Sequence, residues 1–521
     1  MSTTREARSP HGQAAARPAT RDLTRGPIAR TLLVFALPIL AGNVLQSLNG
    51  SINAIWIGRF LGEEALAAAA NANNIMFFLL GAVFGVGMAA TILVGQAMGR
   101  HDDGDAKRVI GTATTFFLGV SCLVAVAGFP LSRTLLAWMG TPDAALPLAE
   151  AYLRVIFLAV PGMYLFASVT ALLRGAGDTR TPFWFLLLVV ALDIVLVPML
   201  MFGIGPLPEL GIAGAAWATL IANLLGLSAM LFYLWKRDHP LWLHRHERRL
   251  YRPDPAILRA LIVKGVPMGL QMVLVSLAMI MMISMVNRHG IDWTSAYGAA
   301  LQLWNYVQMP AMAIGAACSS MAAQNVGAGK WERVDGTART GTLFNFLLTG
   351  ALIAPIVLLD RWTLGLFLPE GSPVLALARH LNQIAVWSFL FFGVNFVVTG
   401  VVRSTGAVVA PLLILALALW GIRIPFASLM QPVLGVDAIW WSFPLSSLSA
   451  MLMSLAYYRW GGWRKARMLA GAPVPPVDTD EIAVPAEVPT PSTGPIADCC
   501  PRTTPHRHLD DGRVVPAAIP S

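Results

Sequence analysis

The sequence predicts an all-α membrane protein with twelve transmembrane helices in two pseudo-symmetric six-helix lobes. Three observations predict this fold: charge is scarce, the apolar residues form twelve long runs, and the chain repeats itself. Of 521 residues, 56% are hydrophobic and 12% are charged, whereas soluble chains carry about 25% charged residues. This composition excludes an ordinary soluble enzyme, a disordered chain and a disulfide scaffold. The net charge of +9 indicates basic loops on one side of a membrane rather than nucleic-acid binding.

The first six apolar runs are separated by charged residues, Gly and Pro, and each is long enough to cross a bilayer, which needs about 20 residues. They cover 31–57, 66–98, 109–132, 148–172, 182–203 and 212–235. We assign these runs to an N-lobe over residues 28–235. Residues 1–27 are polar and rich in Arg, which predicts a disordered cytoplasmic tail.

A basic stretch from Lys236 to Lys264 follows and predicts a cytoplasmic linker over 236–264. Six further apolar runs then form a C-lobe over 265–460. They cover 265–287, 296–325, 340–359, 380–402, 409–431 and 438–458. Residues 461–521 are rich in Pro, Thr and Asp and predict a second disordered cytoplasmic tail. This tail contains Cys499 and Cys500, which we expect to be inert thiols.

Lys and Arg residues predict the orientation. They are concentrated in the two tails and in the even-numbered connections, above all in 236–264. The odd-numbered connections carry fewer, among them Arg59, Arg133, Arg288 and Arg361. Because basic residues mark the cytoplasmic side of membrane spans, we expect a multi-pass cell-membrane protein with both termini in the cytoplasm. An even number of spans agrees with this orientation.

The two halves of the chain resemble each other. Arg174, Gly177 and Pro182 recur 229 positions later as Arg403, Gly406 and Pro411, and Pro38 recurs in the same way as Pro267. Gln96 and Gly99 recur at an offset of 228, as Gln324 and Gly327. A six-span unit returns to its starting side, so the two copies have parallel topology about an axis along the membrane normal. Two such lobes can enclose a central cavity, as transporters do.

Asp193 is the acidic residue that we place near the middle of a span, in WFLLLVVALDIVLVPMLMF. An ionisable side chain at membrane depth is costly and commonly faces a cavity or a polar partner. A carboxyl group there can exchange a proton. The alternative is a protonated Asp that serves only as a hydrogen-bonding group between helices.

Neutral polar residues in other spans predict the walls of a cavity. Gln46, Asn49 and Asn53 follow one another at spacings of three and four in the first span, which places them on one helical face. In the second lobe, Gln302 and Asn305 are polar but uncharged. We expect Gln46, Asn49, Gln302 and Asn305 to line a substrate cavity, although helix interfaces also use such residues.

Motifs of soluble chemistry are absent from the sequence. It contains no P-loop, no HExxH and no CxxC, and its four cysteines have no metal-ligand spacing. We therefore expect neither a cofactor nor a resident metal, and no ATP hydrolysis by this chain alone.

Several motifs in this order resemble the multidrug and toxic compound extrusion (MATE) family. They are the proline-bearing first span ending in WIGRFLGEEALAA, GQAMGR after the second span, LRGAGDTRTP, GIAGAAWATLIAN, KGVPMGLQ and AAQNVGAG. The resemblance covers about residues 27–460. It implies twelve helices in two lobes and export of organic cations and other drugs against inward H⁺ or Na⁺.

The sequence departs from the family's DinF-like branch, which it otherwise resembles most, at two positions. That branch carries an Asp fifteen residues after the first-span proline, where this chain has Asn53 after Pro38. In the fifth span it carries Asn and then Asp four residues later, where this chain has Asp193 and Val197. The resemblance therefore implies a coupling-cation site of Asp193, Asn53 and Thr219, and Val197 is not part of it.

These residues lead us to expect an antiporter, not an enzyme, that exports organic cations by alternating access. A lone carboxylate favours H⁺ over Na⁺, because Na⁺ needs several oxygen ligands. Its partners would be membrane lipid and a small, cationic, amphipathic substrate, and we expect a monomer that binds no nucleic acid.

Two other functions are open at this point. A flippase for lipid-linked oligosaccharides shares the two-lobe plan, but its phosphate-bearing substrate would favour several cations in the cavity, and we place only Arg423 inside a span. Arg423 could pair with carbonyls at a helix end or extend to the nearer membrane surface. A membrane-embedded enzyme would need clustered His, Asp or Ser near one membrane face, which the loops lack beyond HDDGD at 101–105.

Overall fold

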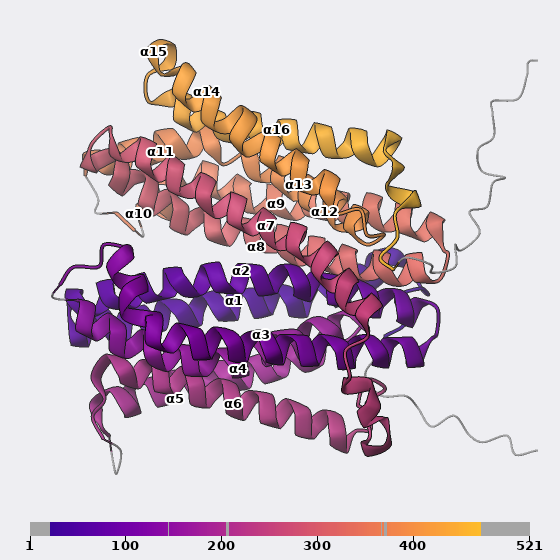
Figure 1. Cartoon of the computed structure of the whole chain (residues 1–521). Helices are drawn as coiled ribbons and strands as arrows, with labels where there is room; N and C mark the ends of the chain where they lie inside the picture. Colours follow the sequence, from indigo (N-terminus) through magenta and orange to yellow (C-terminus); the bar gives the residue numbers. More distant parts are fainter. Residues whose placement is uncertain (1–20, 144, 205–207, 366, 369–371, 470–521) are drawn as a thin grey trace, which may run out of the picture. The chain divides into compact units, whose positions relative to one another are not determined.

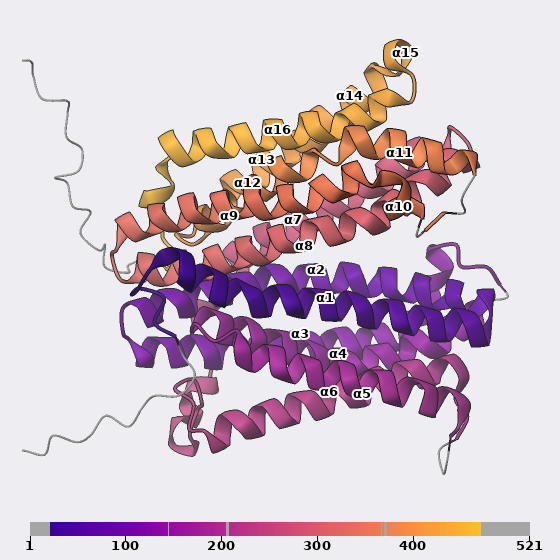
Figure 2. The same cartoon turned by 180° about the vertical axis from the view of Figure 1, so that it is seen from behind.

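The structure is a computed structural model that describes residues 21–143, 145–204, 208–365, 367–368 and 372–469. These residues belong to one compact unit, and they are almost entirely helical (Figures 1 and 2). The N-lobe helices are α1 (Ile28–Leu61), α2 (Glu63–Gly99), α3 (Asp103–Trp138), α4 (Leu146–Gly175), α5 (Arg180–Phe202) and α6 (Gly211–Lys236).

The C-lobe begins after a short 3₁₀ helix, η1 (Arg245–Tyr251). Its elements are α7 (Pro255–Asn287), α8 (Ile291–Gly327), α9 (Trp331–Leu358), α10 (Asp360–Gly365), α11 (Pro373–Ala385), α12 (Ser388–Arg403), α13 (Val409–Ala416), η2 (Leu417–Arg423), α14 (Ile424–Leu429), α15 (Gln431–Leu434), α16 (Asp437–Trp460) and η3 (Gly462–Lys465).

Twelve helical segments of the described residues correspond to the twelve predicted runs. Nine are helices whose length and hydropathy suffice to cross a membrane, counting Val409–Leu429 as one, and a tenth is the pair α11 and α12, bent by 43°. The other two predicted runs lie within α2 and α8, which are 37 residues long each and are not among these ten. The twelve predicted runs are therefore present, and most helices extend beyond the predicted limits by several residues.

Two of the predicted spans are irregular helices. The run predicted at 380–402 starts at Pro373 and contains the bend between α11 and α12. The run predicted at 409–431 contains the π-helical segment η2 between α13 and α14. Bends and π-helical turns depend on local backbone hydrogen bonding, which an apolar pattern does not reveal.

The folded part extends into both predicted tails. Leu23 is fully buried and Trp463 is 1% exposed, and both belong to an apolar cluster of the C-lobe. The predicted boundaries at residues 27 and 461 are therefore displaced, because buried side chains such as Leu23 and Met468 and several hydrogen bonds fasten each otherwise polar segment. Residues 1–20 and 470–521, including Cys499 and Cys500, lie outside the described residues.

Glycines let the two lobes approach closely. A Cβ on Gly85 of α2 would collide with the backbone of Gly265 and Gly269 in α7. Between-lobe packing of α2 against α7 and α8 thus depends on small residues, as is common where membrane helices associate. The first turns of α1 also pack on the C-lobe: Leu32, Phe35 and Ile39 share the apolar cluster that contains Leu23.

Candidate functional site

Asp193 lies in the interior of α5 and is 1% exposed. Val189, Val190 and Val197, which lie one turn before or after it, are also buried. The face of α5 that carries Asp193 is therefore packed against other helices and does not face lipid. A carboxyl group in such a position needs polar partners, because burying it unpaired is costly.

Three side chains supply these partners from two other helices. Asn49 and Asn53 of α1 donate from their Nδ2 atoms to Oδ2 of Asp193, at 2.9 and 2.8 Å. Thr219 of α6 donates from Oγ1 to Oδ1 of Asp193 at 3.1 Å. Both carboxylate oxygens thus accept hydrogen bonds, and hydrogen bonds to an ionised acceptor are stronger than neutral ones. Asp193 joins α1, α5 and α6 in one polar centre.

The helical repeat explains why α1 contributes two donors. Asn49 and Asn53 are four residues apart, so their side chains lie on the same face of the helix. The Oδ1 atoms of both residues are buried and have no hydrogen-bond partner among the described residues. The site therefore has two uncommitted carbonyl oxygens beside the carboxylate.

The residues implied by the family resemblance come together here: Asp193, Asn53 and Thr219 are in direct contact. Asn49, which we expected to line the cavity, also contacts Asp193 directly. Val197, which replaces an acidic residue of the related branch, is fully buried.

Sequence reasoning did not identify Asn223. Its Nδ2 donates to the backbone oxygen of Thr219 at 2.8 Å, one turn earlier on α6. This contact braces the turn that carries the Thr219 hydroxyl. The spacing of four between the two residues on an apolar span was the available signal.

The other residues predicted to line a cavity do not take part in this hydrogen-bonded centre. Gln46, Gln302 and Asn305 are exposed, and Asn305 accepts a hydrogen bond of 2.9 Å from Gln308 of its own helix. None of the three has a described hydrogen bond to Asp193 or to its donors. Exposed polar side chains on membrane helices suit the wall of a water-filled cavity.

Arg423 is held by partners that differ from both expectations. Its Nε donates to Oγ of Ser446 at 2.8 Å, and its guanidinium lies 4.5 Å from the ring centre of Phe443. Thus α16 supplies both a hydroxyl and an aromatic face to the guanidinium. In the described part of the chain, no group of three His, Cys, Asp or Glu residues could hold a metal ion.

Comparison with known proteins assigns the chain to a family. The family model described as MatE matches residues 38–199 and 267–429, which together span more than half of the chain. The chain belongs to the MATE family. The two matched segments begin at Pro38 and Pro267, the prolines related by the internal repeat, so each lobe matches the family separately.

Relatives of this MATE chain include two proteins of Bacillus subtilis (strain 168). The probable multidrug resistance protein YoeA is 35% identical over 451 residues, covering 86% of this chain and 97% of the relative. The probable multidrug resistance protein YpnP is 32% identical and covers 86% and 98%. With the family match and relatives named as multidrug resistance proteins, the MATE chain is a transporter of the multidrug efflux class and not an enzyme.

Solved structures confirm the two-lobe fold of the MATE chain. One is an outward-facing multidrug resistance MATE transporter of the MOP superfamily, 20% identical, with a TM-score of 0.78 over 85% of this chain and 98% of that one. Another is a MOP superfamily transporter from Pyrococcus furiosus, with a TM-score of 0.77 over 84% and 96%. At this identity the likeness concerns the fold alone.

Proposed function

We propose that the chain is an H⁺-coupled antiporter that exports organic cations by alternating access, with Asp193 as the proton site. The observation that carries this proposal is the convergence of Asn49, Asn53 and Thr219 on the Asp193 carboxylate. It is a charge-stabilising cage around a carboxyl group, buried within an apolar span.

The chemistry of the donors supports H⁺ over Na⁺. Hard cations such as Ca²⁺ and Mg²⁺ are held by several converging oxygens, and Na⁺ has the same requirement. Around Asp193, the groups that converge are two amide nitrogens and a hydroxyl hydrogen. These donors stabilise a negative carboxylate, and the two amide nitrogens cannot coordinate a metal cation. A proton needs only one carboxylate oxygen, so it is the cation that this site can take up. A Na⁺ site would have to use the Asn49 and Asn53 carbonyl oxygens as ligands.

Protonation gives a mechanism for the exchange. When Asp193 is ionised, it attracts a cationic substrate and accepts three charge-assisted hydrogen bonds. When it is protonated, the attraction and much of the hydrogen-bond strength are lost, so substrate is released and α1 and α6 are held less tightly. In the cycle we propose, the proton enters with the cavity open outward, and it leaves with the cavity open inward. Exchange of one proton for a monovalent cation is electroneutral.

We further propose that the end of the helix bundle where α1 begins and α2, α4 and α8 end faces the cytoplasm. This end, called the basic end below, carries Arg21, Arg25 and the basic residues of the linker from Lys236 to Lys264. Gln46, Gln302 and Asn305 would line the substrate cavity, and the transporter would act as a monomer in the cell membrane. A flippase for a phosphate-bearing substrate is less well supported, because Arg423 is engaged by Ser446 and Phe443.

Transport from proteoliposomes tests the coupling ion. The purified protein would be reconstituted and loaded with a fluorescent organic cation, and a pH gradient or a Na⁺ gradient would be imposed separately. We expect the pH gradient to drive concentrative transport in Na⁺-free buffer. Transport driven by the Na⁺ gradient alone would contradict the proposal of proton coupling, and flux that never becomes concentrative would contradict antiport.

A further inference from the structure

Two glutamines related by the internal repeat cross between the lobes in opposite directions. Gln96 of α2 donates from Nε2 to the backbone oxygen of Ser404, 2.7 Å away, in the C-lobe. Gln324 of α8 donates from Nε2 to the backbone oxygen of Gly175, 2.9 Å away, in the N-lobe. The acceptors are also repeat-related, since position 404 lies 229 residues after position 175. Each lobe therefore offers the other the same contact.

The two acceptors are backbone oxygens at helix ends, which explains why a side chain with an amide N–H suits positions 96 and 324. Gly175 is the last residue of α4 and Ser404 directly follows α12, and the last carbonyls of a helix lack partners within the helix. Each glutamine thus satisfies a helix end of the opposite lobe. One turn further, α2 and α8 meet at Gly99 and Gly327, where a Cβ on either would collide with the carbonyl oxygen of the opposite glutamine.

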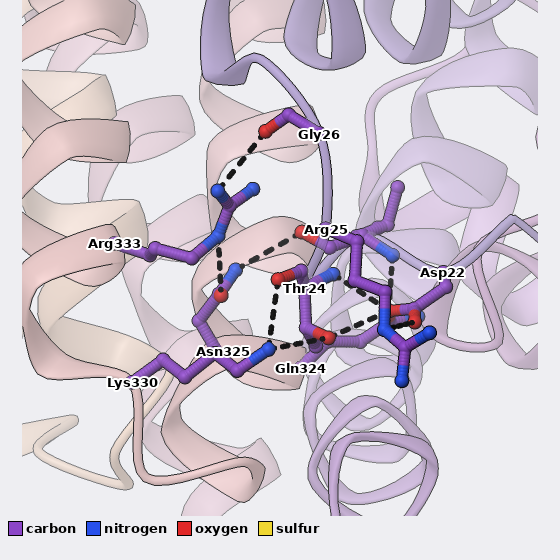
Figure 3. Close-up of polar contacts among 9 residues, drawn as sticks. Asp22, Thr24, Arg25, Gly26, Gln324, Asn325, Lys330 and Arg333 are labelled. Atoms are coloured by element: carbon purple, nitrogen blue, oxygen red, sulfur yellow. Dashed lines mark hydrogen bonds and ion pairs between the residues drawn. The ribbon is translucent and has the colours of Figure 1, made fainter.

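The N-terminal segment Arg21–Gly26, called the strap here, lies beside Gln324, Asn325, Lys330 and Arg333, as Figure 3 shows for its residues Asp22, Thr24, Arg25 and Gly26. The Oε1 atom of Gln324 accepts from the backbone N–H of Leu23 at 3.0 Å, and Asn325 donates to the Leu23 oxygen at 3.3 Å. Lys330 donates to the Thr24 oxygen and Arg333 to the Gly26 oxygen, both at 3.0 Å. Gln324 is therefore held at both of its polar atoms.

The strap also reaches the N-lobe, because the backbone N–H of Arg21 donates to the Gly177 oxygen at 3.4 Å. Gly177 needs to be glycine, since its φ is 90° and a Cβ there would collide with the Arg21 backbone oxygen. The strap thus bridges the α4–α5 connection of the N-lobe and the α8–α9 connection of the C-lobe.

We propose that Gln96 and Gln324 form a latch that holds the basic end closed, with the strap reinforcing the Gln324 half. This inference rests on the proposed alternating-access function: the latch is closed while the opposite end is open, and both hydrogen bonds break when the basic end opens. The latch residues position the lobes and do not contact substrate or the coupling ion. Because each hydrogen bond contributes modestly, loss of one shifts the closed-to-open ratio by roughly two- to tenfold.

Distance measurements between spin labels test the latch. Lys236 of α6 and Arg339 of α9 are exposed and would be replaced by cysteines in a background free of native cysteines. Spin labels on these two cysteines report the separation of the lobes in nanodiscs. We expect one dominant short distance in the parent and a growing longer population in Gln96→Met, Gln324→Met and the double variant. Removal of residues 1–26 should produce the Gln324→Met result. Gln431→Met, in α15, is the matched control and should not change the distances.

Several outcomes would overturn the latch. The double variant must first elute as a single species and keep its thermal stability. Unchanged distances in that protein would then contradict the latch. An equal shift of the distances in Gln431→Met would also contradict it. The proposed function fails separately, through absence of gradient-driven transport by the parent protein. Gln324→Glu gives a second check, because a carboxylate cannot donate to the Gly175 oxygen and should open the basic end as Met does.

A second inference rests on a different feature, a cavity of ≈ 580 Å³ beside the strap. Its wall includes Arg21, Arg180, Trp184, Phe185 and Tyr233. Neither Arg21 nor Arg180 has an ion-pair partner among the described residues. The Trp184 side chain is 62% exposed next to them, as expected of an aromatic residue at a membrane interface.

The acidic residue in this wall, Asp178, is engaged within the protein. Its Oδ1 accepts from the backbone N–H groups of Arg180 and Thr181, both at 3.0 Å, and so caps the start of α5. The cavity therefore presents two guanidinium groups that form no ion pair among the described residues, beside aromatic side chains and the single carboxylate of Asp178. We infer that it binds the phosphate headgroup of an anionic phospholipid, since basic pockets at the cytoplasmic ends of membrane helices suit such headgroups.

Native mass spectrometry of the detergent-purified protein tests the lipid site. We expect phosphatidylglycerol to be retained in preference to phosphatidylcholine, and Arg21→Gln/Arg180→Gln to reduce that retention about tenfold. Arg288→Gln, an exposed arginine at the other end of the bundle, is the control and should retain the lipid. Equal retention of the two lipids, or undiminished retention in the double variant, would overturn the site. Displacement by equimolar inorganic phosphate would show a site for a free anion and overturn the lipid assignment.

Discussion

Asn53 of α1 donates a hydrogen bond of 2.8 Å to Oδ2 of Asp193 in α5. This contact joins the helix that also packs on the C-lobe near its start to the carboxyl group that we propose as the proton site. Changes in the charge of Asp193 therefore act directly on the helix shared by the two lobes.

Asn53→Asp places a second carboxylate against Asp193. Two carboxylates in contact cannot both ionise readily, so the variant should retain a proton at higher pH and its efflux optimum should move upward. Added carboxylate oxygen also favours Na⁺, so Na⁺ stimulation of efflux should appear. Efflux from proteoliposomes across a series of pH values, with and without Na⁺, measures both effects. An unchanged pH profile without Na⁺ stimulation would place Asn53 outside the site.

Asn49→Leu removes one donor from Asp193 and should reduce pH-driven efflux while leaving membrane insertion intact. The loss of a hydrogen bond to a charged group costs roughly 1.5–3 kcal/mol, equivalent to about ten- to a hundredfold. The control is Ser51→Ala on the same helix, because the Ser51 hydroxyl is exposed and, among the described residues, bonds only to the Ser47 oxygen. Equal initial rates in the two variants would argue against a role of Asn49 in coupling.

Gly85→Ala should lower the thermal stability of the detergent-solubilised protein. Its new Cβ has no room against the α7 backbone at Gly265 and Gly269, and such overpacking costs roughly 1–3 kcal/mol. Gly119→Ala is the matched control, because a Cβ at Gly119 of α3 would meet nothing within 4 Å. If melting temperatures fell equally in both variants, close approach of α2 and α7 would not be the cause.

His239 should make stability depend on pH. It lies in the connection after α6, and its Nε2 is 4.0 Å from Oδ2 of Asp178, with both side chains buried. Burial lowers the pKa of His239 from its usual 6.5, and the nearby Asp178 opposes this only in part. Because the unfolded state then takes up a proton more readily than the folded state, stability is complete above pH 6.5 and decreases as the pH falls below it.

The measurement for His239 is the melting temperature as a function of pH. His239→Gln should flatten the decrease between neutral and mildly acidic pH relative to the parent protein. A parent and a variant with parallel pH profiles would contradict the assignment of this dependence to His239.

The sequence predicted the site better than it predicted the contacts between lobes. Asp193 stood out because its span is otherwise apolar, and the spacing of Asn49 and Asn53 placed both on one helical face. Family resemblance then connected Asn53 and Thr219 to Asp193. The direct contact of Asn49 with the carboxylate depends on how α1 rotates against α5, which one helix's periodicity does not determine.

The strap and the latch could not be predicted in this way. The internal repeat paired Gln96 with Gln324, but it does not reveal that each side chain reaches a helix end in the opposite lobe. Leu23 stands in a polar, Arg-rich segment, and its partner Gln324 is 301 positions away. Contacts of this kind follow from the tertiary arrangement alone.

Proton release on substrate binding tests the central claim, that Asp193 is the proton site, most directly. A fluorescent organic cation would be added to purified protein in weakly buffered detergent solution, at a pH at which the carboxyl is protonated beforehand. The parent protein should release about one proton for each cation bound, and Asp193→Asn should release none. Equal proton release from Asp193→Asn, with cation binding retained, would contradict the account.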